Sequence, residues 1–272
     1  MPDIAAFLPM LGLLLAIGAF AGVIAGLLGV GGGIVLVPAF FYAFGHLGYG
    51  GPQLMQVCLA TSLATIVVTS VRSILGHHRK GAVDWAILRA WGPYIAAGAL
   101  GGVLVAASLK SVTLQAIFGI LALIAGLYMA FGRDHWRLGP QMPAGPRRAG
   151  LGGSLGFFSS LMGIGGGTFG VPMMTLYSLP IHRAVATAAG FGLMIAVPSA
   201  IGYLFLAVEN PPPLTIGAVN LPAFAVIIAM TLITTPFGVR LAHAMDAKPL
   251  KRAFAIFVIV VALNMLRKVA GW

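Results

Sequence analysis

The stretch Gly29–Pro38, which reads GVGGGIVLVP, returns 134 residues later as Gly163–Pro172, which reads GIGGGTFGVP. In each copy a run of glycines interrupts an otherwise apolar segment. Inside a lipid bilayer, irregular backbone is tolerated only where it faces protein or a water-filled cavity. Matched interruptions in the two halves of an apolar chain are therefore typical of a transport site.

The composition predicts a polytopic membrane protein. Of the 272 residues, 60% are hydrophobic and only 8% are charged, whereas soluble domains carry about 25% charged residues. The net charge of +11 sits mostly at segment ends, which favours a role in membrane orientation over nucleic-acid binding. The single cysteine, Cys58, excludes an internal disulfide and lies in an apolar run, where we expect a small buried side chain.

Apolar runs of about 20 residues predict an all-α fold. Each half reads as a glycine-broken helix pair followed by three transmembrane helices. In the first half we expect apolar segments at about 4–30, 34–44, 54–76, 85–108 and 114–131. In the second half we expect them at about 151–164, 168–179, 184–208, 221–241 and 253–269. The predicted organisation is a first repeat over 1–131, a basic cytoplasmic linker over 132–148 and a second repeat over 149–272.

The repeat extends past the glycines. Ala60-Thr61 matches Ala186-Thr187, and Val71–Gly76 matches Val197–Gly202 with the same offset of 126 residues. Arg72 has Pro198 as its counterpart, so any role of this arginine is not shared by the second half.

The basic loops predict how the halves are oriented. Cytoplasmic loops carry an excess of Lys and Arg, and here the basic loops are 79–80, 133–148 and 248–252. Placing all three in the cytoplasm makes the first broken pair begin and end outside and the second begin and end inside. This is an inverted-topology repeat. Arg267 and Lys268 fit less well, because they would lie outside. Each broken pair could be a re-entrant hairpin or a full crossing with a short return.

With both motifs in place, the chain resembles the TauE/SafE family of sulfite and organosulfonate exporters, also called the 4-toluene sulfonate uptake permeases. The resemblance rests on the two GxGGG…P motifs and on Thr61 and Thr187, and it covers essentially the whole chain. It implies transport of small sulfur-containing oxyanions or related organic anions across the bacterial inner membrane.

The glycine runs are the first candidates for binding an anion. A helix that begins after a break presents free N–H groups and a partial positive charge of about +0.5. Two such ends near the middle of the membrane would bind an anion without any formal charge. The alternative is close helix packing, which we expect for the GxxxG pairs Gly22–Gly26 and Gly98–Gly102.

Hydroxyl groups and one arginine complete the candidate set. A threonine or serine hydroxyl can donate to an oxyanion, or instead to its own helix. Arg72 lies about one turn inside a helix end, where it could guide the substrate or extend to the lipid headgroups. We expect Arg240 to act as a topology signal. The candidate substrate-binding residues are Gly31, Gly32, Gly33, Thr61, Ser62, Arg72, Gly165, Gly166, Gly167, Thr168 and Thr187.

The acidic residues all fall at segment ends or in loops, so no carboxylate lies within a predicted span. A carboxylate relay for protons or sodium is therefore not expected. Nothing has metal-ligand spacing or the pattern of an activated nucleophile, so we expect no enzyme activity, no metal and no cofactor. The predicted function is a secondary transporter of small sulfur-containing anions, working as an exporter in the inner membrane. A channel-like anion pore and an importer of another small organic anion remain open, and so does assembly as a homo-oligomer.

Overall fold

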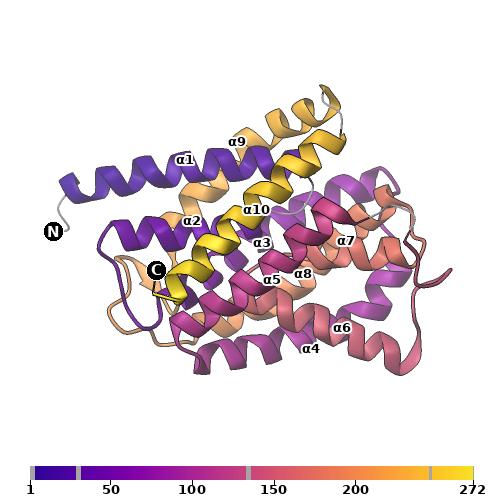
Figure 1. Ribbon diagram of the computed structural model, residues 1–272, viewed down its shortest axis with the longest axis horizontal. Coiled ribbons are helices and arrows are strands. Elements are labelled where there is room, and N and C mark those ends of the chain that lie inside the picture. The colour runs from indigo at the N-terminus through magenta and orange to yellow at the C-terminus, as the bar shows by residue number, and fades with distance from the viewer. Residues whose placement is uncertain (1–3, 29–31, 133–135, 245–246, 272) are drawn as a thin grey trace.

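The computed structural model describes residues 4–28, 32–132, 136–244 and 247–271 (Figure 1). These residues form ten helices and one two-stranded hairpin. The helices of the first half are α1 (Ile4–Leu28), α2 (Gly33–His46), α3 (Leu54–Arg79), α4 (Trp85–Ser108) and α5 (Ser111–Phe131). Those of the second half are α6 (Gly145–Leu161), α7 (Gly167–Leu176), α8 (Ile181–Leu204), α9 (Leu221–Ala244) and α10 (Ala247–Val269). The hairpin joins β1 (Thr215–Ile216) to β2 (Val219–Asn220).

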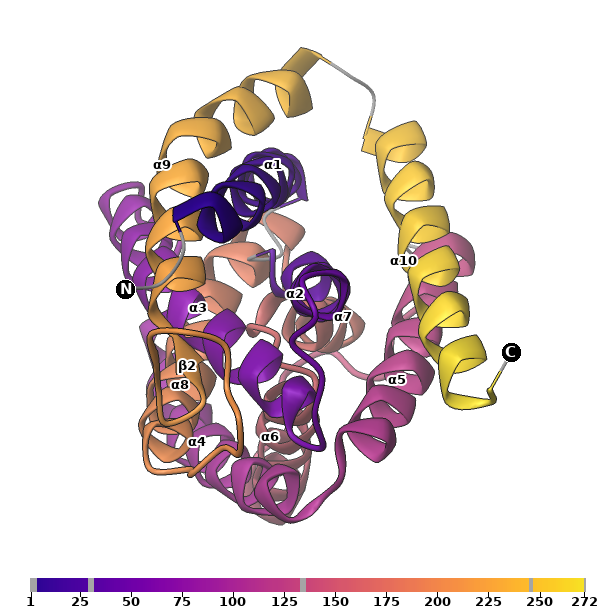
Figure 2. The ribbon, with the colours of Figure 1, turned by 90° about the vertical axis from the view of Figure 1, so that its left-hand side faces the viewer.

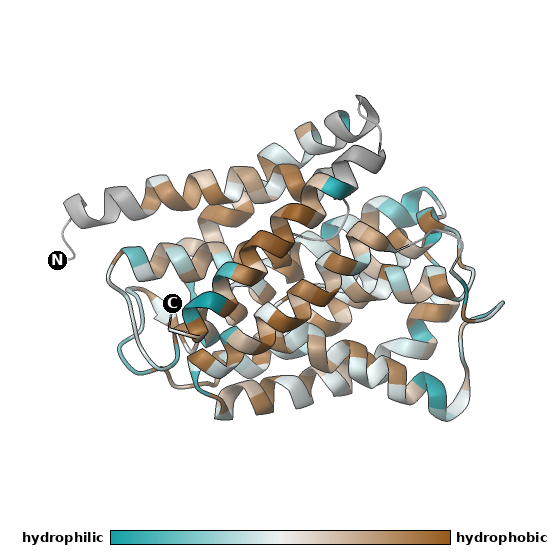
Figure 3. Cartoon of the chain, viewed as in Figure 1, coloured by the Kyte–Doolittle hydropathy of each residue, from teal (hydrophilic) through white to brown (hydrophobic). Residues whose placement is uncertain are grey.

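The all-α polytopic prediction is confirmed. Among the described residues, five helices, α3, α4, α5, α8 and the 221–238 part of α9, are long and apolar enough to cross a membrane. Apolar residues run along the lengths of the helices, and the hydrophilic ones gather at helix ends and in loops (Figure 3). Cys58 is fully buried and unpaired, as expected.

Each broken pair combines a longer helix with a short one. The 25 residues of α1 make a helix about 37 Å long, which forms the upper left part of the molecule in Figure 1. The 14 residues of α2 turn back toward the end where α1 begins. The second pair is shorter, with 17 residues in α6 and 10 in α7. Viewed along the helices, α2 and α7 lie inside a ring of longer helices (Figure 2).

Packing between helices follows a matched scheme across the two halves. Helix α1 packs along α9 and α6 packs along α4, while α2 rests on α3 and α7 on α8. The remaining large contacts join α3 to α8, α5 to α10 and α4 to α8, and the counterpart of the last, α3 to α9, is also present. Exchanging the helices of one half for those of the other leaves this list unchanged.

Glycines allow the closest of these crossings. A Cβ on Gly98 would collide with the backbone of Gly153, and one on Gly102 would collide with the side chain of Ser160. At the crossing of α1 and α9, a Cβ on Gly22 would collide with the side chain of Thr234. The structure thus shows Gly98 and Gly102 in tight helix packing, as their GxxxG spacing predicts.

Three boundaries differ from the prediction by four residues or more. Helix α10 begins at Ala247 rather than near Ala253, so the basic stretch 248–252, predicted to be a loop, is helical. Helix α6 begins at Gly145, so the last four residues of the expected linker are helical. Helix α8 ends at Leu204 rather than near Val208. Beyond this end, the side chain of Gln53, just before α3, binds the chain twice. Its Nε2 donates to the Ala207 carbonyl, and its Oε1 accepts from the N–H of Glu209.

Candidate functional site

The two glycine breaks have different backbone geometry. Gly32 precedes α2 with a φ of 71°, a left-handed conformation that favours glycine. Its counterpart Gly166 precedes α7 with an ordinary φ of −66°, and the left-handed residue of the second break is Gly163, with a φ of 63°. Gly166 is needed for another reason: a Cβ there would lie 2.5 Å from the Cβ of Phe191 and 2.6 Å from the carbonyl oxygen of Ala188. Gly31 lies outside the described residues.

The breaks meet inside the protein. A Cβ built on Gly33 would lie 3.0 Å from both the Gly163 carbonyl oxygen and the Ile164 Cα. The hydroxyl of Ser62, on α3, donates to the same Gly163 carbonyl at 2.7 Å. The interruption of the first half therefore touches that of the second, and α3 ties the two together.

Both breaks place a helix N-terminus in this region. In α2 the first N–H groups bonded back to the N-cap carbonyl are those of Val35 and Leu36, and in α7 it is that of Gly170. The N–H groups ahead of them have no partner within the helix, as in any α-helix. Together with the helix dipoles, they make the region favourable for an anion.

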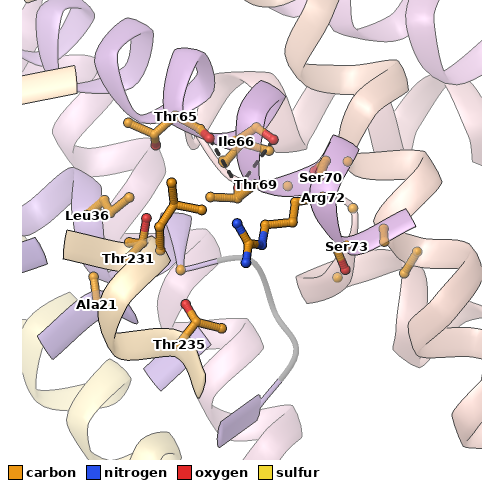
Figure 4. Close-up of a pocket in the computed structure, with 18 of the residues that line it drawn as sticks. Ala21, Leu36, Thr65, Ile66, Thr69, Ser70, Arg72, Ser73, Thr231 and Thr235 are labelled. Carbon is orange, nitrogen blue, oxygen red and sulfur yellow. Dashed lines mark hydrogen bonds between the residues drawn. The ribbon is translucent and has the colours of Figure 1, made fainter. Parts of the chain in front are cut away.

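A cavity of about 490 Å³ opens beside the meeting point (Figure 4). Its wall draws residues from α1, α2, α3, α8 and α9, from both breaks and from the first residue of α7. The glycines in the wall are Gly32, Gly165, Gly166, Gly167 and Gly192. The polar side chains in the wall are those of Thr65, Thr69, Ser70, Arg72, Ser73, Thr231, Thr235 and Arg240. No carboxylate is among the described lining residues.

The hydroxyls of the wall fall into two classes. Thr65 donates its proton to the Ser62 carbonyl at 2.7 Å, and Thr231 donates to the Ile228 carbonyl at 3.0 Å. Thr69 likewise donates to its own helix, as the dashed lines of Figure 4 show. A hydroxyl has one proton, so these three threonines offer the cavity only lone pairs.

The hydroxyls of the second class are free to donate a hydrogen bond. Within the described part of the chain, no hydrogen bond engages the hydroxyls of Ser70, Ser73 or Thr235. Ser70 lies closest to the second break: its Oγ is 2.6 Å from the position a Cβ on Gly192 would take, and the N–H nitrogen of Gly166 is 3.4 Å from that same position. Ser70 and Gly166 therefore lie close together in the wall of the cavity.

Two arginines supply the only formal charge in the described wall. The guanidinium of Arg72 extends into the space between Thr69 of α3 and Thr231 and Thr235 of α9 (Figure 4). Arg240, which the sequence assigned to topology, lies in the wall as well, with its guanidinium carbon 5.8 Å from the ring centroid of Phe237. The described part of the chain contains one ion pair, between Arg183 and Asp84, and neither residue lines the cavity.

The structure brings some of the predicted site residues together and places others elsewhere. Gly32, Arg72, Gly165, Gly166 and Gly167 line the cavity. Gly33 and Ser62 hold the two breaks against each other without lining it.

The predicted threonines do not line the cavity. Thr61 and Thr187 are fully buried, and each accepts a hydrogen bond from the opposite half, from the N–H of Asn220 and of Asp84 respectively. Thr168 is also buried, and its hydroxyl has no partner among the described residues.

Sequence reasoning missed most of the polar wall. Thr65, Thr69 and Ser73 are spaced four apart along α3, as are Thr231 and Thr235 along α9. Residues at this spacing share one face of a helix. A search for polar stripes within the apolar spans would have found both sets.

Comparison with known proteins gives a consistent result. A family model described as "Sulfite exporter TauE/SafE" matches residues 14–265. A "Probable membrane transporter protein" of Haemophilus influenzae is 32% identical over 260 residues, which cover 94% of this chain and 98% of the relative. A protein of Methanocaldococcus jannaschii, also named a probable membrane transporter, is 28% identical over 262 residues, which cover 96% and 97% of the two chains. No solved structure matches.

Proposed function

We propose, from the premise that this chain belongs to the TauE/SafE sulfite exporter family and is a membrane transporter, that it exports a small sulfur-containing anion across the bacterial inner membrane. Sulfite and small sulfonates are the substrates with this chemistry. The anion would sit in the cavity between the two broken helix pairs, where N–H groups and hydroxyls replace its hydration shell.

One observation carries the proposal: the cavity gathers hydrogen-bond donors and positive charge beside the two helix N-termini. Gly165, Gly166 and Gly167 bring backbone to its wall, Ser70 brings a free hydroxyl and Arg72 a guanidinium. Such donors bind the oxygens of an oxyanion, and charge-assisted hydrogen bonds are the stronger ones. Thr65, Thr69 and Thr231 donate to their own helices and so would contribute no hydrogen bond to the anion.

Export needs no acid relay in this scheme. An inside-negative membrane potential favours outward movement of an anion, by about 2.3 kcal/mol per charge at 100 mV. No carboxylate lines the described cavity wall, so the wall offers no acidic group to carry a coupled proton. The predicted cytoplasmic position of the basic loops would also concentrate anions at the inner side.

The matched packing supports an inverted repeat. Under this proposal the repeats span 1–131 and 149–272, and the counterpart of each helix in one half is the helix five places later. The pairs α1–α9 and α6–α4 then become equivalent, as do α2–α3 and α7–α8. Rocking of one repeat against the other would expose the cavity alternately to the two sides.

Flux through proteoliposomes tests the function. Purified protein is reconstituted with sulfite inside, a potential is imposed, and release is compared for sulfite, small sulfonates and sulfate. We expect saturable release that speeds up when the side containing the anion is made negative. Release that rises linearly with concentration would indicate the channel-like alternative. Absence of flux for every small anion, with folded protein, would refute the proposal.

A matched pair of variants ties the flux to the cavity. Arg72→Gln removes a wall charge, whereas Arg89→Gln removes an exposed charge near the start of α4, outside the described wall. Only the first should slow release at low substrate concentration. Equal slowing by both would mean that the effect comes from the overall charge of the protein.

A further inference from the structure

A second cavity lies at the end of the molecule where α2 and α10 finish. Its volume is about 570 Å³, and it lies away from the glycine breaks. Its polar lining consists of Tyr42, His46 and Lys268, and its apolar lining includes Leu13 and Ile17 of α1. None of these residues belongs to the proposed transport site.

Lys268 is held in an unusual way. Its ammonium nitrogen lies 4.8 Å from the ring centroid of Tyr42 and 5.5 Å from that of Phe41. Two aromatic faces attract a cation but leave its N–H donors without acceptors. Within the described residues no carboxylate pairs with Lys268, and its neighbour Arg267 adds a second positive charge. The basic pair that fitted the topology least well thus lies beside a cavity.

The Tyr42 side chain supplies a second, independent observation at this cavity. Its hydroxyl is buried and has no hydrogen-bond partner among the described residues. Buried hydroxyls are nearly always paired, and Tyr42 itself lines the cavity. A turn of the phenol ring toward the cavity would let an acceptor bound there complete the pairing.

We propose that this second cavity binds an oxyanion group, with Lys268 as its main charged contact and Tyr42 and His46 as further donors. The apolar side of the cavity, formed by Leu13, Ile17, Ala39 and Ala43, suits a hydrocarbon chain attached to that group. The ligand chemistry is therefore an oxyanion on an apolar tail, as in the phosphate headgroup of a membrane lipid. A free oxyanion could use the same donors.

Thermal unfolding in a neutral maltoside detergent tests this site with two probes, dodecyl phosphate and inorganic phosphate. The variants are Lys268→Gln, Lys268→Arg and the control Lys110→Gln, which removes an exposed lysine just before α5, outside both cavities. Each ligand-induced shift in Tm is measured against the same variant without ligand. Any packing lost with the cation–π contact therefore does not enter the comparison.

We expect dodecyl phosphate to stabilise the wild type, Lys110→Gln and Lys268→Arg, and to bind Lys268→Gln about tenfold more weakly. Tyr42→Phe should weaken binding by a smaller factor. Tighter binding of dodecyl phosphate than of inorganic phosphate identifies a lipid headgroup as the source, and equal binding identifies a free oxyanion. Equal ligand-induced shifts in Lys268→Gln and Lys110→Gln, for both probes, would overturn the proposal.

Discussion

The hydroxyl of Thr61 accepts a hydrogen bond from the backbone N–H of Asn220 at 3.0 Å, which joins α3 of the first half to the start of α9 in the second. Thr187 repeats the arrangement from the opposite side, accepting from the N–H of Asp84 at 3.0 Å. Asn220 and Asp84, whose N–H groups donate these bonds, also play the same role in the two halves. The side chain of Asn220 caps α9 through the N–H of Ala223, and that of Asp84 caps α4 in the same way. These bonds fasten each half to the other.

Thr61→Val should therefore act on stability rather than on substrate affinity. The change keeps the shape of the side chain but leaves the buried N–H of Asn220 without an acceptor, at a cost of about 1–3 kcal/mol. We expect a lower Tm and an unchanged KM for flux. A raised KM at unchanged Tm would instead make Thr61 a substrate ligand.

Gly165→Ala should affect transport with little effect on folding. A Cβ on Gly165 would meet only the side chain of Ile66, at 3.3 Å, while its nearest backbone neighbour is 3.9 Å away. The new methyl group would narrow the cavity that Gly165 lines, so we expect slower flux at a nearly native Tm. Gly12→Ala, where nothing lies within 4 Å, is the matched control and should change neither.

Gly166→Ala should behave differently, because its Cβ would press on the backbone of α8. Overpacking of this kind costs about 1–3 kcal/mol. A clear fall in Tm is expected in a thermal unfolding assay, together with loss of flux. If Gly166→Ala unfolded at the native temperature, the close approach of α7 and α8 would have to be wrong.

Ser70→Ala and Thr65→Val separate the two classes of hydroxyl. The Ser70 proton is free for a substrate, whereas the Thr65 proton is bound to the Ser62 carbonyl. Loss of one hydrogen bond to a charged group is worth about 1.5–3 kcal/mol, so Ser70→Ala should weaken anion binding at least tenfold. Thr65→Val should leave binding close to native. Equilibrium titration with sulfite distinguishes them, and the reverse ranking would exclude the proposed use of these hydroxyls.

The variants Arg72→Lys and Arg72→Gln test whether the positive charge of Arg72 in the cavity wall binds the anion. A guanidinium can hold two oxygens of an oxyanion at once, whereas an ammonium acts as a point charge. We expect the KM for sulfite to rise in the order wild type, Lys, Gln, with the difference shrinking at high salt. An identical KM in all three would mean that Arg72 only extends to the lipid headgroups.

Much of the fold follows from the sequence because lipid imposes simple rules. The lengths of the apolar runs predict helices α3, α4 and α5, and the duplicated glycines predict the two breaks. The path of the chain just after α8 could not be foreseen, because Gln53, about 150 residues away in the sequence, binds it there through its side chain. The short hairpin before α9 was missed because its two-residue strands carry no periodicity.

The candidate site was less accessible from the sequence. The repeat identified Gly32 and Gly165, but the role of a hydroxyl depends on which face of its helix meets the cavity. It also depends on depth along the helix: Thr61 and Thr65 share a face of α3 one turn apart, yet Thr61 accepts from Asn220 of β2 and Thr65 lines the wall. Arg240 reads as a topology signal from its position near a helix end, and only the packing of α9 beside α3 brings it to the cavity.

The most direct measurement is a density map of the anion itself. Selenite, a heavier analogue of sulfite, can be soaked into crystals of the transport-competent protein and located by its anomalous signal. The account predicts a peak in the cavity between Gly32 and Gly165–Gly167, within hydrogen-bond reach of Ser70 and Arg72. A protein that transports selenite but shows its only peak away from the two glycine breaks would contradict the account.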